Sequence, residues 1–284
     1  MPAALDKLKH IVVLMMSNRS FDHMLGALKA LDPRIDGLTG NESNPDDTGT
    51  LVKVQPKAQF QGQLDPDPDH HFPGVDLQIF NEDNSSPRIA NMQGFIKSYF
   101  QQRRDVNHSQ NIMYYFAPEK LPVLTTLATE FAVFNGWFSS VPGPSVCNRA
   151  FAHYGTSFGQ VGANLFSDKQ PFKNVFERLA SNNPAHTAKV YYYDQASFTM
   201  EAVLPRHQPQ LFSTYEQFIA DCMKGTLPHY SFVEPNHNDH DGDNGLVIAS
   251  DQHPDHHVQG GSALLPRYTT RSEKMKLSGK VRPF

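Results

Sequence analysis

An apolar run followed at once by polar residues is the feature of this sequence that most restricts its fold. Residues 11–16 read Ile-Val-Val-Leu-Met-Met, and Ser17, Asn18 and Arg19 come directly after them. A short run of this kind predicts a strand that is buried on both faces of a parallel sheet. Because open α/β sheets bind ligands at the carboxyl ends of their strands, we expect a polar site where this strand ends.

Helical and strand patterns alternate along the rest of the chain. Further strands are predicted at residues 131–134, 189–193 and 230–233, and helices at 22–31, 91–104, from Pro122, from near Asn148, at 172–179 and at 214–224. Asp22 is the expected N-cap of the first helix, and Gly225 is expected to end the last. This alternation predicts an α/β fold with a mostly parallel central sheet flanked by helices.

Polar residues follow four of the predicted strands. They are Ser17 with Asn18, then Ser145, Asp194 and Glu234. In a parallel sheet the carboxyl ends of the strands lie on one edge, so these side chains are expected to converge there.

Composition and charge exclude several classes of protein. The chain has 284 residues, 39% of them hydrophobic, which is enough for one large domain or two small ones. A net charge of −4 does not indicate a nucleic-acid partner. The chain contains no apolar run near the ~20 residues of a membrane helix. The two cysteines, Cys147 and Cys222, do not indicate a disulfide scaffold.

The beginning of the chain imitates a secretory signal only in part. Lys7 and Lys9 precede the apolar run, but six apolar residues are fewer than the ~7–15 of a signal peptide core. We therefore expect no signal peptide, and a protein that is either cytoplasmic or exported by a non-classical route.

Ser145 is the candidate nucleophile. It follows the loop Val141-Pro142-Gly143-Pro144 and precedes a predicted helix. The free N–H groups and the positive dipole of a helix N-terminus favour phosphate. A serine hydroxyl becomes a good nucleophile when a base or a metal ion activates it. The alternative is an ordinary serine in a proline-rich turn.

Two segments near these residues carry a resemblance to a known family. The first is Asn18-Arg19-Ser20-Phe21-Asp22, and the second, within residues 131–157, contains Gly143-Pro144-Ser145 and Asn148-Arg149. They resemble motifs of the phosphoesterase family, the phospholipase C and acid phosphatase enzymes of bacteria and plants. That family usually has Glu-Asn-Arg-Ser-Phe-Asp in the first motif, and Gly-Pro-Thr or Gly-Pro-Ser followed by Pro-Asn-Arg in the second.

The resemblance implies roles for these residues. Ser145 matches the nucleophile, which is also a metal ligand, and Asn18 matches a second ligand of a divalent metal ion. Asn148 and Arg149 match the Asn-Arg pair and are expected to contact substrate. Ser17 stands where the family has a glutamate ligand. On the residues alone, Asn18 could equally cap the following helix or turn.

Two further motifs carry the same resemblance. Asp67-Pro68-Asp69-His70 is similar to the family's Asp-Pro-x-His, and residues 227–235 and 251–254 are similar to Leu-Pro-x-Tyr-Ser-Phe-x-Glu-Pro and Asp-x-His-Pro. The resemblance implies that His70 and His253 bind phosphate or protonate the leaving group, and that Glu234 lies near the substrate. The neighbouring His71 competes with His70 for this role, and a solvated loop histidine is the alternative.

The resemblance covers residues 8–261 and implies a three-layer sandwich like that of alkaline phosphatase. The resemblance does not extend to the family's last strands or to its late acidic block. The first two acidic residues of that block are metal ligands in the family. We expect residues 1–261 to form an incomplete domain of this kind. Residues 262–284 carry six Lys and Arg against one Glu and are expected to be a disordered basic tail.

The implied function is hydrolysis of a phosphate ester or phospholipid headgroup. The resemblance implies a metal-assisted reaction through a phosphoserine intermediate. Because hard cations are bound mainly through carboxylates, the missing ligands predict impaired activity. The alternative is a catalytically inactive paralogue or a truncated fragment that keeps the scaffold and binds phosphate weakly.

A metal-binding loop at residues 236–257 is a third possibility because this segment is rich in His and Asp. Asp239, Asp241 and Asp243 have the spacing of a calcium loop, but Asn244 and Ser250 replace its glycine and its glutamate. We expect a solvated loop there.

Overall fold

A four-stranded parallel sheet forms the centre of the molecule. The computed structural model of the chain describes residues 8–164, 166, 170–193, 195–204, 208–242 and 245–261. The sheet has the order β1 (Ile11–Leu14), β6 (Tyr230–Glu234), β4 (Ala188–Tyr192) and β5 (Phe212–Thr214). All three pairings are parallel.

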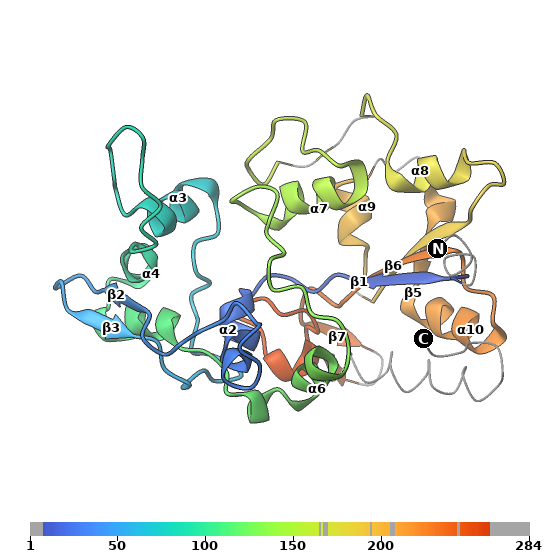
Figure 1. The fold of residues 1–284 in the computed structure, drawn as a ribbon. Coiled ribbons are helices and arrows are strands. Elements are labelled where there is room, and N and C mark those ends of the chain that lie inside the picture. The colour runs from blue at the N-terminus through green and yellow to red at the C-terminus, as the bar shows by residue number, and fades with distance from the viewer. Residues whose placement is uncertain are drawn as a thin grey trace.

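Helices lie on both faces of this sheet (Figure 1). One face is covered by α7 (Ser145–Tyr154), α8 (Val175–Ala180) and α9 (Phe198–Ala202), and the other by α10 (Tyr215–Lys224). The prediction of an α/β three-layer sandwich is therefore confirmed.

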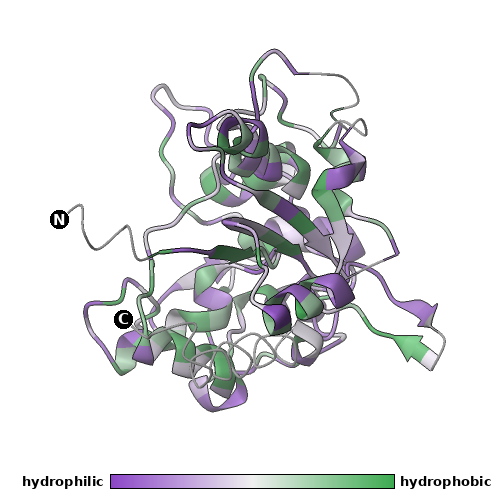
Figure 2. Ribbon diagram, turned by 90° about the vertical axis from the view of Figure 1, so that its right-hand side faces the viewer, coloured by the Kyte–Doolittle hydropathy of each residue, from purple (hydrophilic) through white to green (hydrophobic). Residues whose placement is uncertain are grey.

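Alternate residues of the central strands build a core on each face. In β4, Val190 packs with the α8 side chain Phe176, whereas Tyr191 packs with Phe218 of α10. This alternation follows from the two-residue repeat of a strand. Burying an aromatic or aliphatic side chain of this kind contributes about 1.5–3 kcal/mol. Figure 2 shows the sheet between its two layers of helices.

The helix α10 shows why this part of the fold follows from local sequence. Thr214 caps its first turn by accepting a hydrogen bond from the Gln217 amide, and its buried side chains include Tyr215 and Phe218. Gly225 ends the helix in the left-handed conformation, with φ of 68°, which glycine adopts without strain. The predicted helix at 214–224 and its glycine stop are confirmed.

A lobe of helices and a hairpin lies beside the sheet (Figure 1). It is built from β2 (Ser43–Pro45), β3 (Leu51–Lys53), α3 (Phe72–Phe80), α4 (Phe95–Arg103), α5 (Val106–Ser109) and η2 (Gln110–Met113). The other elements are α2 (Phe21–Leu25), η1 (Gly26–Ala30), η3 (Pro118–Lys120), α6 (Pro122–Glu130), η4 (Pro209–Leu211), β7 (His240–Gly242) and β8 (Gly245–Val247). In the described part of the chain, every helix is too short or too polar to cross a bilayer.

Three local predictions are wrong. Among the described strands, β1 lies at the edge of the sheet with β6 as its one partner, and it is not buried on both faces; Ile11 is 52% exposed. Residues 131–134 form no strand because no described strand pairs with them. The first helix is capped by Ser20, whose hydroxyl accepts from the His23 amide, so Asp22 lies inside the helix.

Some predictions fall on residues outside the described part of the chain. These are the strand-end residue Asp194, the calcium-loop positions Asp243 and Asn244, and the tail at 262–284.

Candidate active site

The segment after β1 lies beside the segment that contains His253. The Gln252 amide donates to the Ser17 carbonyl at 2.8 Å, and the Asn18 amide donates to the Gln252 carbonyl at 3.3 Å. These hydrogen bonds join two motifs that are far apart in the sequence. The segments of Asn18 and His253, to both of which the resemblance gives site roles, therefore lie side by side.

Arg19 holds this junction together. Its Nη2 donates to the carbonyl of Pro254 at 2.8 Å and to that of His256 at 3.3 Å, and its Nη1 donates to His23 Nε2 at 2.9 Å. Burial lowers the pKa of Arg19 to about 10, so the guanidinium keeps its charge at neutral pH. Burial, together with the neighbouring Arg19, lowers the pKa of His23 to about 3, so its neutral ring accepts this hydrogen bond. Sequence reasoning gave Arg19 no role, since its partners are carbonyl groups that only the fold brings near.

His70 and His253 meet at a shared carboxylate. His70 Nδ1 lies 3.0 Å from Asp67 Oδ2, and His253 Nε2 lies 3.7 Å from the same oxygen. The two rings are in edge-to-face contact with centroids 5.7 Å apart. The hydrogen bond to Asp67 raises the pKa of His70, although burial opposes the shift. This favours the imidazolium form, which can give a proton to a leaving group.

A second carboxylate extends this cluster. Asp255 Oδ1 lies 2.6 Å from His253 Nδ1 and 3.7 Å from His256 Nε2. His256 Nδ1 in turn lies 2.7 Å from Asp251 Oδ1, and this hydrogen bond raises the pKa of His256. Imidazole and carboxylate groups therefore alternate from His70 to Asp251.

Two groups in this cluster could hold a metal ion. They are Asp67 with His70 and His253, and His253 with Asp255 and His256; within each group the candidate ligand atoms lie within 4.8 Å of one another. The Oδ1 atom of Asp67 is buried and has no hydrogen-bond partner among the described residues, so a cation could satisfy it. By contrast, the predicted ligands Asn18 and Ser145 are both neutral, which suits a divalent ion poorly without a carboxylate.

Ser145 is the first residue of α7, and the side chain of Asn148 shapes the loop before it. Asn148 Oδ1 accepts from the Val141 amide at 3.1 Å, and its Nδ2 donates to the carbonyls of Val141 and Gly143 at 3.0 and 3.1 Å. Asn148 thus fixes the loop that presents Ser145. A substrate contact by Asn148 remains a prediction.

The Ser145 loop lies against the beginning of α3. A Cβ atom built on Gly143 would lie 3.1 Å from the Val161 carbonyl oxygen and 3.9 Å from the amide nitrogen of Phe72. Because Phe72 is two residues after His70, the loop of the predicted nucleophile lies beside the segment that carries this histidine. A side chain at position 143 would press on the Val161 carbonyl, so glycine is suited to this close approach.

Arg149, which lies one helical turn after Ser145 on α7, forms a buried ion pair with Glu234. Arg149 Nη1 lies 3.3 Å from Glu234 Oε1, and neither side chain is more than 1% exposed. Glu234 also accepts from the Ser197 hydroxyl at 2.6 Å and from the Thr199 amide at 2.9 Å. These contacts fasten α7 and α9 to the carboxyl end of β6. The predicted substrate contacts of Arg149 and Glu234 remain predictions.

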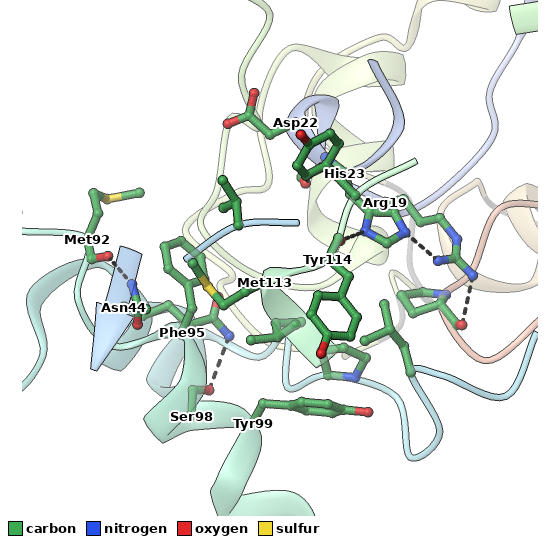
Figure 3. Close-up of a pocket in the computed structure, with 18 of the residues that line it drawn as sticks. Arg19, Asp22, His23, Asn44, Met92, Phe95, Ser98, Tyr99, Met113 and Tyr114 are labelled. Carbon is green, nitrogen blue, oxygen red and sulfur yellow. Dashed lines mark hydrogen bonds between the residues drawn. The ribbon is translucent and has the colours of Figure 1, made fainter. Parts of the chain in front are cut away.

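A cavity of about 670 Å³ opens beside the cluster (Figure 3). Its polar lining residues include Asn18, Arg19 and His70, and also Asp22, Glu42, Asn44, Asp69 and Gln78. Its apolar lining residues include Leu38, Val54, Leu64, Met92, Phe95, Ile112 and Met113. Figure 3 shows Arg19 and His23 on one side and Met92 and Phe95 on the other. Ser145 is not among the lining residues, so this cavity brings Asn18 to His70 but not to the predicted nucleophile.

Comparison with known proteins gives the chain its family. Its sequence matches the Phosphoesterase family over residues 8–276, which extends past Gly261, where the motifs end. Three relatives from Arabidopsis thaliana are non-specific phospholipases C: C1 is 38% identical over 265 residues, C6 is 35% identical over 266 and C3 is 33% identical over 271. These matches take in 89%, 91% and 91% of this chain but 47%, 48% and 50% of the relatives, so the chain spans about half of their length. The chain belongs to the phosphoesterase family.

Proposed function

We propose that this chain hydrolyses phosphoric esters in the manner of a phospholipase C, with Ser145 as nucleophile and His70 and His253 as proton donors. The observation that carries the proposal is the meeting of His70 and His253 at Asp67, beside the loop of Ser145. The two histidines come from separate motifs, and they were predicted to share one task. The names of the plant relatives support the reaction class.

The reaction uses groups that the fold holds in place. The Ser145 hydroxyl releases its proton to water as its oxygen attacks phosphorus in line, and the bond from phosphorus to the leaving oxygen breaks. The leaving oxygen takes a proton from a ring N–H of His70 or His253. Free amide groups at the beginning of α7 stabilise the phosphoryl oxygens. Water then attacks the phosphoserine and passes one proton to the histidine that gave up its own. The bond from phosphorus to the serine oxygen breaks, the serine oxygen takes a proton from solvent, and the phosphorylated headgroup is released.

A divalent metal ion is best held in this chain by Asp67, His70 and His253. This set includes a carboxylate and two imidazoles, whereas Asn18 and Ser145 supply only neutral oxygens. A metal ion bound there would neutralise charge on the phosphoryl group. If His70 binds the ion through Nδ1, its Nε2 still carries a hydrogen for the phosphate or the leaving group. Because Ser17 replaces the family's glutamate, we expect lower activity than in relatives that keep it.

The cavity favours an ester with an apolar leaving group. Asn18, Arg19 and His70 lie at a polar part of the cavity, and an apolar wall that includes Met92, Phe95 and Met113 borders further polar side chains, among them Glu42 and Gln78. A diacylglycerol part would bury its chains against this wall, while the phosphate stays near His70. A small phosphomonoester would leave the apolar wall in contact with water.

A second candidate function is phosphate binding without turnover. Ser17 favours it, because Asn18 then lacks the neighbouring carboxylate of a hydrolase site. On this account the serine, the histidines and the α7 N-terminus bind a phosphorylated ligand, and no phosphoserine forms.

Turnover of defined substrates separates the two candidates. Purified protein with added divalent metals is assayed on phosphatidylcholine and p-nitrophenyl phosphate, beside Ser145→Ala and the exposed loop control Ser140→Ala. We expect turnover by the unaltered chain and by Ser140→Ala, with a loss of at least about 10³-fold in Ser145→Ala. Equal rates in all three proteins contradict the hydrolase and leave phosphate binding.

A further inference from the structure

Residues 253–256 place two imidazoles and a carboxylate on one short turn. Asp255 Oδ1 lies 2.6 Å from His253 Nδ1 and 3.7 Å from His256 Nε2. The candidate ligand atoms of the three residues all lie within 4.8 Å of one another. Ligand atoms around a tetrahedral zinc ion are about 3.3–3.6 Å apart, because the bonds to zinc are about 2.0–2.2 Å long. These side chains therefore need only small rotations to surround one ion.

The backbone of this turn is held in place by Arg19. The Nη2 atom of Arg19 donates to the carbonyls of His253, Pro254 and His256 at 3.3, 2.8 and 3.3 Å. The His256 amide also donates to the His253 carbonyl at 3.0 Å. The side chains of the two histidines are each 25% exposed, so an ion can reach them from solvent. A ligand set on a fixed backbone loses little conformational freedom when it binds an ion.

A buried carboxylate orients His256 toward the same point. Asp251 Oδ1 lies 2.7 Å from His256 Nδ1, and the Asp251 side chain is 3% exposed. Because an ionised carboxylate only accepts hydrogen bonds, His256 carries a hydrogen on Nδ1, and its neutral ring keeps a lone pair on Nε2. Histidines that bind metal ions almost always donate their other ring N–H in this way. The hydrogen bond to Asp251 therefore gives His256 the orientation of a metal ligand.

The charges around the turn favour a divalent cation. Asp67, Asp251 and Asp255 all interact electrostatically with Arg19. Three carboxylates against one guanidinium leave an excess of two negative charges when the histidines are neutral. Two imidazole ligands suit zinc, whereas magnesium and calcium prefer oxygen ligands.

We propose that His253, Asp255 and His256 bind a zinc ion, with water as the fourth ligand. This ion competes for the ring of His253 with the Asp67 group, which we define as Asp67, His70 and His253. The Asp67 group uses His253 Nε2, which lies 3.7 Å from Asp67 Oδ2, whereas the zinc ion uses Nδ1. A neutral imidazole has one lone pair and therefore binds an ion through only one of its nitrogens.

Zinc on the turn thus changes what His253 offers to the Asp67 group. With the ion on Nδ1, the hydrogen of the ring lies on Nε2, and Asp67 and His70 remain as the ligands of an ion in the Asp67 group. The inference concerns metal binding alone and does not depend on the proposed hydrolysis.

Calorimetric titration with Zn²⁺ tests the site. The metal-free chain is compared with His256→Gln, with Asp67→Asn, and with the control His257→Gln, whose residue belongs to neither group. We expect the unaltered chain to bind zinc with a Kd below about 10 µM. His256→Gln should weaken binding at least about 100-fold, and the other two variants should change it by less than about threefold. Weaker binding by the unaltered chain overturns the proposal. A loss in Asp67→Asn or in His257→Gln as large as that in His256→Gln also overturns it.

Nitrogen NMR of the unaltered chain tests the ligand atoms without any substitution. The histidine rings are labelled with ¹⁵N and followed as one equivalent of Zn²⁺ is added. We expect the shifts of coordination at His253 Nδ1 and His256 Nε2, and a hydrogen on His253 Nε2. Coordination at His253 Nε2, alone or together with Nδ1, contradicts the proposal. If His256→Gln does not fold, this measurement decides.

Discussion

The segments before and after Ser145 differ in burial. After Ser145, α7 buries Arg149 completely and ties it to Glu234 at the end of β6. Before Ser145, residues 131–140 are almost all exposed in spite of their aromatic side chains. Both segments have the sequence of a core element, but among the described residues only the segment after Ser145 is packed against neighbours. Ser145, the proposed nucleophile, is therefore positioned from one side, by the packed helix α7 and the Asn148 hydrogen bonds.

The largest expected difference between the two regions is in stability. Arg149→Ala leaves the buried Glu234 without its cation and is expected to lower the free energy of unfolding by about 3–5 kcal/mol. The matched substitution in the exposed segment, Trp137→Ser, is expected to change it by no more than about 0.5 kcal/mol. Urea unfolding of both variants measures the contrast. Similar losses of unfolding free energy in the two variants would contradict the difference between the two regions.

The site near Asn18 offers a gain of function. Ser17→Glu restores the carboxylate that the family has at this position, and a metal ion beside Asn18 then has an anionic ligand. We expect divalent metal affinity and turnover to rise by about 10–100-fold, by analogy with the effect of single groups around a metal site. Calorimetric titration with Mn²⁺ and the phosphatidylcholine assay measure this, with the exposed Ser140→Glu as control. An equal rise in the control refutes the assignment.

The buried ring of His153 allows a test of the packing between α7 and the sheet. Both ring nitrogens are buried without a partner among the described residues, and the ring packs on Phe176 and Phe232. Burial, together with Arg149, lowers the pKa of His153 to about 3. The unfolded chain takes up a proton near pH 6.5 and the folded chain does not, so stability is lost as the pH falls from about 6.5 towards 3.

A substitution of the same shape removes this loss. His153→Phe is expected to stabilise the protein by about 1–3 kcal/mol at neutral pH, because it removes two unpaired buried polar atoms. Its advantage should grow at pH 5. Thermal unfolding at pH 7.5 and pH 5 checks both effects, and an advantage that shrinks on acidification contradicts a neutral buried histidine.

The smallest expected effect concerns the titration of His70. The hydrogen bond that His70 donates to Asp67 raises the pKa of His70, so its contribution to stability is complete below the ordinary value of 6.5 and is lost as the pH rises through the folded-state value. Asp67→Asn should bring the pKa back towards 6.5, whereas Asp69→Asn should have less effect. Proton NMR titration of the metal-free protein follows the ring directly. An unchanged titration in Asp67→Asn contradicts the shared carboxylate.

The sequence predicts most of the packed elements of the sheet and its helices, but little of the exposed segment at residues 131–140 and of the sheet edge at β1. The elements β6 and α10 carry their own signals, namely an apolar run and a capped amphipathic pattern, so their limits were predicted within a residue or two. The predictions of a strand at 131–134 and of burial on both faces of β1 were wrong. Both depend on neighbouring strands, about which a local pattern carries no information. The same limit applies to Ser20, which replaces Asp22 as cap because both residue types suit that position.

The motifs predicted the candidate site residues His70 and His253, but not the residues that hold them in place. His70 and His253 were assigned a common task from separate motifs, and the structure brings them together. The sequence did not predict the residues that hold the site in place, which are Asp67, Arg19 and Asn148. Their partners are backbone carbonyls or histidine rings that only folding brings within reach.

Trapping the covalent intermediate tests the central claim most directly. The unaltered chain and Ser145→Ala are mixed with phosphatidylcholine and metal ions, quenched in acid within one turnover, digested and examined by mass spectrometry. The account predicts a phosphorylated headgroup bound to Ser145 in the unaltered chain only. Turnover without any modification of Ser145, or equal turnover by Ser145→Ala, would contradict it.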